Sequence, residues 1–191
     1  MENLKLWNAV EKTNPKHTKK ANVRGNNITA IAPQSQIKDA TAQFGAYGAT
    51  WGWSSFDFDF TLLESTGIVI FKGEFFFPGG KFPISTSISA YKDGARTKPD
   101  ADFAKKVETD ALTKALSKLG FNADVFMGLY DDNKYVQEME VAFRPIDVGV
   151  EQIKTMTAQE VKDNWTGLIA TKWSMLDNET INKINSLFNQ Q

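Results

Sequence analysis

The strongest constraint on the fold is a change of hydrophobic period in the middle of the chain. Apolar residues first alternate with polar ones, as in a half-buried strand, at Phe56, Phe58, Phe60 and Leu62. Two apolar runs follow at 68–77 and 82–91, joined by the turn sequence Pro-Gly-Gly-Lys of residues 78–81. A period of 3.6 then runs over 103–119 and ends at Gly120. The pattern predicts an antiparallel three-stranded sheet packed by a long helix, an α+β fold with a β-β-β-α core.

The segment before this core predicts a loop, a strand and a helix. Residues 13–27 are polar and basic and indicate a loop, and 28–32 predict a short strand. An amphipathic helix is expected from Ser35 onward, with Gly45 as its C-terminal cap.

The segment after the core predicts a small helical region. We expect an irregular stretch at 124–135, a strand at 138–143 and a linker at 144–152. Two short helices should then begin at the capping-box sequence of Thr157 and at Asp177. The predicted domains are a core of residues 1–145 and a C-terminal helical region of residues 146–191.

Composition excludes several classes of function. The chain has no cysteine and one histidine, His17, which argues against zinc sites and thiol nucleophiles. There is no P-loop for ATP, no apolar run of about 20 residues for a membrane span and no signal peptide pattern. We expect a soluble intracellular protein without a metal or other cofactor.

Charge is unevenly distributed along the 191 residues. The formal net charge is −1, but it amounts to +4 over residues 1–45, −3 over 46–80, +3 over 81–120 and −5 over 121–191. On the predicted long helix, charged side chains recur every four residues and form one row, at Lys106, Asp110, Lys114 and Lys118. This asymmetry favours a polyanion-binding face.

Aromatic residues lie close to these basic residues in the sequence. Residues 45–53 contain Tyr47, Trp51 and Trp53. Aromatic side chains beside cationic grooves hold single-stranded nucleic acid without reading its sequence. Burial of the two tryptophans at a sheet edge is an equally good interpretation.

Paired carboxylates offer the one route to catalysis. Asp57 and Asp59 project from one face of a strand, and Asp131 and Asp132 lie in a turn, so either pair suits Mg²⁺ in a nuclease. The polar face of a strand and ordinary turn chemistry explain the same residues. We therefore predict no catalytic residue.

One run of residues resembles a known family. The helix AKKVETDALTKALSKLGFN (104–122), followed by GLYDDNKY (128–135), resembles the single-strand DNA-annealing proteins of the Rad-fifty-two-like superfamily, particularly the small bacteriophage members of the Sak type. Their signature helix reads Ala-Val-Thr-Asp-x-Leu, two basic residues, Ala-Leu, two further residues and Phe-Gly, before an Asp-rich turn. The sequence FGAYG (44–48) is similar to the family's Phe-Gly-Tyr-x-Gly-Trp. The resemblance covers roughly residues 28–136.

The resemblance implies an ATP-independent protein that binds and anneals single-stranded DNA in homologous recombination and repair. Copies of the core would form a ring or helical filament with the strand in an outer basic groove, bases outward. The implied location is the cytoplasm of a bacterial host, and the implied partners are single-stranded DNA, further copies of the chain, and a host single-strand-binding protein or phage exonuclease. Two alternatives remain: a protein that protects single strands without pairing them, and a metal-dependent nuclease.

The resemblance also assigns roles to particular residues. Lys114 matches a basic signature position and should contact phosphate, Asp110 matches a structural acidic position, and Tyr47 lies one place from the family's groove tyrosine. Thr113 stands where the family often has a first basic residue, and Ser117 stands where another can occur. The predicted DNA-binding residues are Lys38, Tyr47, Lys81, Lys92, Arg96, Lys98, Lys105, Lys106, Lys114 and Lys118.

Overall fold

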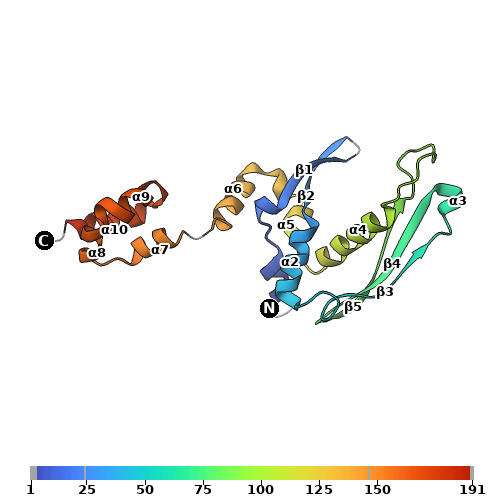
Figure 1. The fold of residues 1–191 in the computed structure, drawn as a ribbon, viewed down its shortest axis with the longest axis horizontal. Helices are drawn as coiled ribbons and strands as arrows, with labels where there is room; N and C mark the ends of the chain where they lie inside the picture. The colour runs from blue at the N-terminus through green and yellow to red at the C-terminus, as the bar shows by residue number, and fades with distance from the viewer. Residues whose placement is uncertain (1–3, 24, 146, 190–191) are drawn as a thin grey trace. The chain divides into compact units, whose positions relative to one another are not determined.

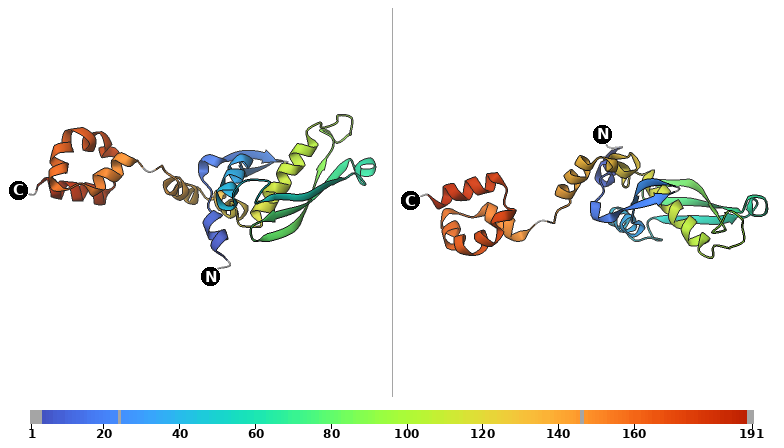
Figure 2. Two further views of the ribbon diagram at one scale, coloured as in Figure 1. Left: turned by 60° about the horizontal axis from the view of Figure 1, so that its bottom comes forward. Right: turned by 90° about the horizontal axis from the view of Figure 1, so that it is seen from above.

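The computed structural model describes residues 4–23, 25–145 and 147–189, and the chain divides into two compact units, Met1–Phe143 and Arg144–Gln191 (Figures 1 and 2). The described elements of the first unit are α1 (Lys5–Val10), η2 (Pro15–His17), β1 (Thr18–Val23), β2 (Asn26–Ile31), α2 (Pro33–Phe44), β3 (Gly52–Asp59), α3 (Leu63–Thr66), β4 (Ile68–Phe77), β5 (Gly80–Ser89), α4 (Phe103–Ser117), α5 (Ala123–Phe126), η3 (Leu129–Asp131) and α6 (Asn133–Ala142).

The first unit is built on the three-stranded antiparallel sheet β3-β4-β5, with α4 packed on one face (Figure 1). This confirms the predicted α+β class and the hairpin between β4 and β5. The first strand was placed too late in the sequence, because β3 ends at Asp59. Phe60 and Leu62 therefore lie beyond the strand, and both are exposed.

The core lies between the sheet and α4. Phe71 and Phe75 of β4 are fully buried against the helix, where Ala111 and Ala115 allow a close approach. Trp51 is also fully buried and contacts Phe75 edge-on. Truncating one such aromatic side chain typically costs about 3–5 kcal/mol of stability, so this layer holds α4 firmly in place.

The predicted loop at 13–27 is wrong over much of its length. Thr18 to Val23 form β1, which pairs with β2 in a second, two-stranded sheet. Gly25 adopts a positive φ of 87° in the turn, where its N–H donates to the side chain of Asn22. Because this hairpin is polar, β1 has none of the apolar alternation by which a strand is recognised.

A buried carboxylate ties the start of the chain to the segment after α4. Asp124 accepts hydrogen bonds from the backbone N–H (2.7 Å) and the hydroxyl (2.5 Å) of Thr13, and from the hydroxyl of Tyr135 (3.0 Å). Tyr130 donates to the carbonyl of Thr13. Burial and the carboxylate of Asp124 raise the pKa of Tyr135 to about 12. Asp124 and the two tyrosines therefore fix this segment to the unit.

The predicted strand at 138–143 is wrong, because these residues belong mostly to helix α6. Asp132 caps the helix by accepting from the N–H of Lys134 at 2.8 Å. Tyr135 and Met139 are spaced by four and face the body of the unit, and Met139 is buried.

The second unit is helical. Its described elements are α7 (Val148–Thr155), α8 (Ala158–Asn164), the π-helical turn η4 (Trp165–Ile169), α9 (Ala170–Lys172), η5 (Trp173–Met175) and α10 (Asn178–Phe188). Its buried core consists of Ile153, Met156, Val161, Ile169, Leu176 and Ile184. The two predicted helix starts are confirmed: Thr157 forms a full capping box and Asp177 caps α10.

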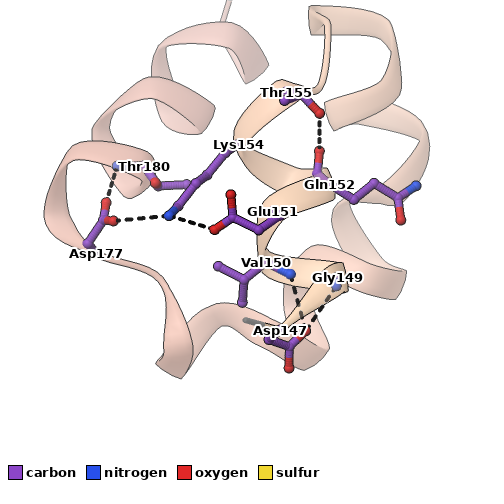
Figure 3. A network of polar contacts seen from close by, with 9 residues as sticks. All are labelled: Asp147, Gly149, Val150, Glu151, Gln152, Lys154, Thr155, Asp177 and Thr180. Atoms are coloured by element: carbon purple, nitrogen blue, oxygen red, sulfur yellow. Dashed lines mark hydrogen bonds and ion pairs between the residues drawn. The ribbon is translucent and has the colours of Figure 1, made fainter. Parts of the chain in front are cut away.

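The predicted linker at 144–152 contains the start of α7. Asp147 caps this helix by accepting from the N–H groups of Gly149 and Val150 (Figure 3). Lys154 pairs with Glu151 at 2.9 Å and reaches Asp177 at 3.9 Å, which joins α7 to the start of α10 (Figure 3).

The acidic surplus of the C-terminal part of the sequence lies mainly outside this second unit. Residues 121–143 carry −4, whereas residues 144–191 carry −1. Among the residues that the structure describes, no helix combines the length and apolar character needed to cross a bilayer.

Candidate nucleic-acid interface

Helix α4 presents lysines on two different sides. Consecutive helical residues point about 100° apart, so Lys105 and Lys106 diverge. The side next to β5, here called the seam face, carries Lys106, Lys114 and Lys118. The side next to α2, here called the groove face, carries Lys105, Thr109 and Thr113.

Each lysine of the seam face has a partner. The ammonium of Lys106 pairs with Asp100 at 2.6 Å, and that of Lys114 pairs with Asp110 at 2.8 Å. Lys114 also donates to the hydroxyl of Thr86 on β5 at 2.7 Å. Lys118 lies over the ring of Phe82, 5.8 Å from its centroid. Lys114 and Lys118 are thus held against β5, and Lys106 is held by the segment that precedes α4. The side chains of Lys106 and Lys114 stay about half exposed.

The carboxylates of the seam face have structural contacts. Asp100 is buried, and its hydrogen bond with Lys106 holds its pKa below the ordinary value. Asp110 accepts from Thr86 (2.5 Å) as well as from Lys114. It therefore links Lys114 to the sheet through Thr86 of β5.

A groove of about 310 Å³ lies between α2 and α4. Its residues include apolar, hydroxyl and charged side chains, namely Pro33, Gln34, Gln36, Ile37, Tyr47, Lys105, Glu108, Thr109, Leu112, Thr113 and Leu116. Lys105 forms no ion pair with any residue that the structure describes. The groove thus combines an unpaired cation with an aromatic ring.

Tyr47 is held at the groove by the turn that follows α2. Its ring contacts Trp51 edge-on, with centroids 4.9 Å apart, and remains 46% exposed. Gly45 ends α2 with a φ of 92°, and the Trp51 indole N–H donates to its carbonyl at 2.9 Å. A Cβ on Gly52 would come within 3.2 Å of the Tyr47 ring, so glycine permits this close approach. Partial burial, together with the charge of Glu108, raises the pKa of Tyr47.

Gln36 is a feature of the groove that the sequence analysis missed. Its side chain is only 1% exposed, and its Nε2 has no hydrogen-bond partner among the described residues. Gln36, Ala40 and Phe44 are spaced by four, so the amide stands on the inward stripe of α2. A polar residue in an apolar stripe is the sequence signal that marks it.

The other predicted DNA-binding residues are not gathered at this groove. Arg96 donates to the carbonyls of Glu64 and Ser65, each at 3.0 Å, which caps α3. Lys81 pairs with Glu74 at 2.8 Å. The remaining three are exposed, two in the loop after β5 and one on α2: Lys92, Lys98 and Lys38.

The two tryptophans are packing residues in the first unit. Trp51 is fully buried, and Trp53 is half-buried with its ring against Phe71 and Phe75. Full burial removes Trp51 as a stacking platform, and Tyr47 is the exposed aromatic of that segment.

Two of the four candidate carboxylates, Asp59 and Asp132, have local partners. Asp59 pairs with Lys72 at 2.6 Å and accepts from Thr61, which holds its pKa well below the ordinary value. Asp132 caps α6. Within the described ranges, no cluster of three or more His, Asp or Glu side chains is placed to hold a metal ion.

No protein-family model matches this chain, and no curated protein matches it with significance.

Proposed function

We propose that the chain is a single-stranded DNA-binding protein that anneals complementary strands without ATP, in recombination and repair. The observation that carries the proposal is the arrangement around α4. The seam face supplies a fixed row of half-exposed lysines, and the groove face supplies Lys105 beside the exposed ring of Tyr47.

The lysines of α4 and its surroundings account for phosphate binding. Cations near a polyanion release its condensed counterions, which gives affinity without regard to sequence. Lys92 and Lys98, in the loop that leads into α4, add two further exposed cations to this set. The acidic side chains of residues 121–143 belong to the segment that follows α4 and its lysine row in the sequence.

Sequence-indifferent binding also suits annealing, which needs base edges left free for the second strand. Tyr47 contributes stacking, at about 1–3 kcal/mol per base, and every base has a ring face. Direct readout by rigid bidentate side chains in a duplex groove is not required.

Assembly into a ring or filament is part of the proposal. The sheet has two unpaired edges, β3 and β5. Large apolar side chains are exposed in β3, at Phe56 (57%), and just after it, at Phe60 (50%) and Leu62 (39%). Open edges and apolar patches favour association with further chains. Repetition around an assembly multiplies the weak contacts that each copy makes with the strand.

The direct test mixes two complementary oligonucleotides carrying a donor and an acceptor fluorophore, with the protein and without ATP. Accelerated duplex formation is the expected result. Binding without acceleration would contradict annealing and support strand protection. Mg²⁺-dependent cleavage would contradict it and support a nuclease. Light scattering with and without DNA tests the assembly, which a monomer under both conditions would contradict.

A further inference from the structure

We propose that the α2–α4 groove captures a single unstacked nucleobase of the bound strand, with the neighbouring phosphate on Lys105. The inference rests on the proposed function and adds to it a site for one base per copy of the chain, whose edge faces the groove while the edges of the other bases stay free for pairing. It stands on three features that occur together: the groove, a lysine without an ion-pair partner among the described residues, and a buried amide nitrogen without a hydrogen-bond partner among them.

The size and walls of the groove fit one heteroaromatic ring system. Its volume of about 310 Å³ is at the low end of small-molecule sites, which span roughly 300–1,000 Å³. Ile37, Leu112 and Leu116 line the groove with apolar surface, and Tyr47 adds an aromatic ring. Bases taken out of a stack are held in this way, between aromatic and apolar side chains.

The polar groups of the groove suit the edge of a base. The Gln36 amide both donates and accepts, as do the hydroxyls of Thr109 and Thr113, and Glu108 accepts. Because an amide and hydroxyls can pair with either a carbonyl or an exocyclic amine, every base finds partners. The site therefore remains compatible with sequence-indifferent binding.

An unpartnered buried amide gives the site a reason to bind. A buried N–H without a hydrogen bond destabilises the folded protein, and an acceptor on the edge of a base would satisfy it. The Nε2 atom is buried, and Gln36 is one of the residues that line the groove. The last torsion of a glutamine side chain is soft, so a small rotation brings the nitrogen to the ligand.

The cation at the groove selects a nucleotide over a neutral apolar ligand. Lys105 lines the same groove as Tyr47 and has no carboxylate partner in the described part of the chain. A lysine ammonium is a compact charge that suits a phosphate oxygen. One base and its phosphate would thus satisfy both the aromatic wall and the cation.

The test compares a mixed-sequence oligonucleotide with an abasic strand of the same length and phosphate number, by fluorescence anisotropy. The wild type should bind the base-bearing strand about 5- to 150-fold more tightly, as stacking predicts. Thr113→Trp, which fills the groove, should remove most of this preference, and Gln36→Leu should reduce it. Ser117→Trp on the same helix, outside the groove-lining set, is the matched control and should retain it. Circular dichroism establishes that each variant is folded.

The outcomes separate the two proposals. Equal binding of both strands by the wild type, or an unchanged preference in Thr113→Trp and Gln36→Leu, would overturn base capture and leave strand binding intact. Failure to bind either strand would overturn the proposed function as well.

Photocrosslinking locates the base independently of affinity. An oligonucleotide containing 5-iododeoxyuridine, irradiated in complex with the protein, should crosslink to Tyr47 or to the groove-lining peptides of α2 and α4, as mapped by mass spectrometry. Crosslinks confined to the seam face, or to the second unit, would overturn the assignment.

Discussion

The two sides of α4 carry similar residues in different circumstances. On the seam face, Lys106 and Lys114 are paired with aspartates and Lys118 lies on Phe82. On the groove face, Lys105 has no ion-pair partner among the described residues, and Gln36 nearby has an unsatisfied amide. The function of a lysine on this helix therefore depends more on its partners than on its place in the row. Lysines with ion-pair partners contribute positive electrostatic potential and stabilise the fold, whereas groups without partners can bind a ligand.

The largest expected effect is at Tyr47. Tyr47→Ala should weaken single-stranded DNA binding by about 5- to 150-fold, corresponding to about 1–3 kcal/mol for one stacked base. Phe126→Ala is the matched control, because Phe126 is similarly exposed but lies on α5. Anisotropy titrations measure both, and equal effects would show that Tyr47 has no special role.

The sharpest comparison of the two faces uses adjacent lysines. Lys105→Met should reduce the salt slope of strand binding by about 0.7, the value for one lost phosphate contact on a single strand. Its thermal midpoint should not change, because Lys105 has no ion-pair partner in the described chain. Lys106→Met should instead lower the thermal midpoint, because Asp100 is left buried without its cation. Equal changes of salt slope and thermal midpoint in the two variants would contradict the distinction between the two faces.

Acid stability should also distinguish the faces. The hydrogen bond from Lys106 lowers the pKa of Asp100 below its ordinary 3.8. The ionised pair therefore stabilises the fold fully above that ordinary pKa, and the contribution is lost as pH falls through the lowered folded-state value. Below about pH 4, the thermal midpoint of Lys106→Met should fall less steeply with decreasing pH than that of the wild type. Lys105→Met should follow the wild type, and a weaker dependence in that variant would contradict the assignment.

The smallest effects are expected from the pair Lys114 and Asp110. Lys114→Ala should weaken strand binding a few-fold and flatten its salt dependence, because one cation is lost near phosphate. Asp110→Asn should instead strengthen strand binding, since it removes a negative charge that partly neutralises Lys114. Salt titrations of both variants test this, and changes of the same sign would remove the seam face from the DNA-binding surface.

The sequence predicted the fold of the core well where periodicity is strong. The alternation in β3, the turn before β5 and the 3.6 period of α4 led to the correct class and order of elements. Polar β1 was missed because strands without apolar alternation resemble loops. The helical residues 138–142 were mistaken for a strand because a short apolar pattern fits both periods.

The candidate site was less accessible to prediction. Spacing by four placed the seam lysines in one row, but only the fold shows which lysines already have carboxylate partners. Arg96 was predicted as a DNA-binding residue, and only the fold shows that it also caps α3 by donating to the carbonyls of Glu64 and Ser65. Gln36 could not be recognised as unsatisfied, because satisfaction depends on what the tertiary structure brings to each buried atom.

The most direct test of this account is the affinity of the wild-type protein for single-stranded DNA across a range of salt concentrations. The account predicts tight binding at low salt, with the logarithm of affinity falling linearly with the logarithm of salt concentration, and a slope that Lys105→Met reduces by about 0.7. The absence of binding at low salt, or an affinity that does not change with salt, would contradict it.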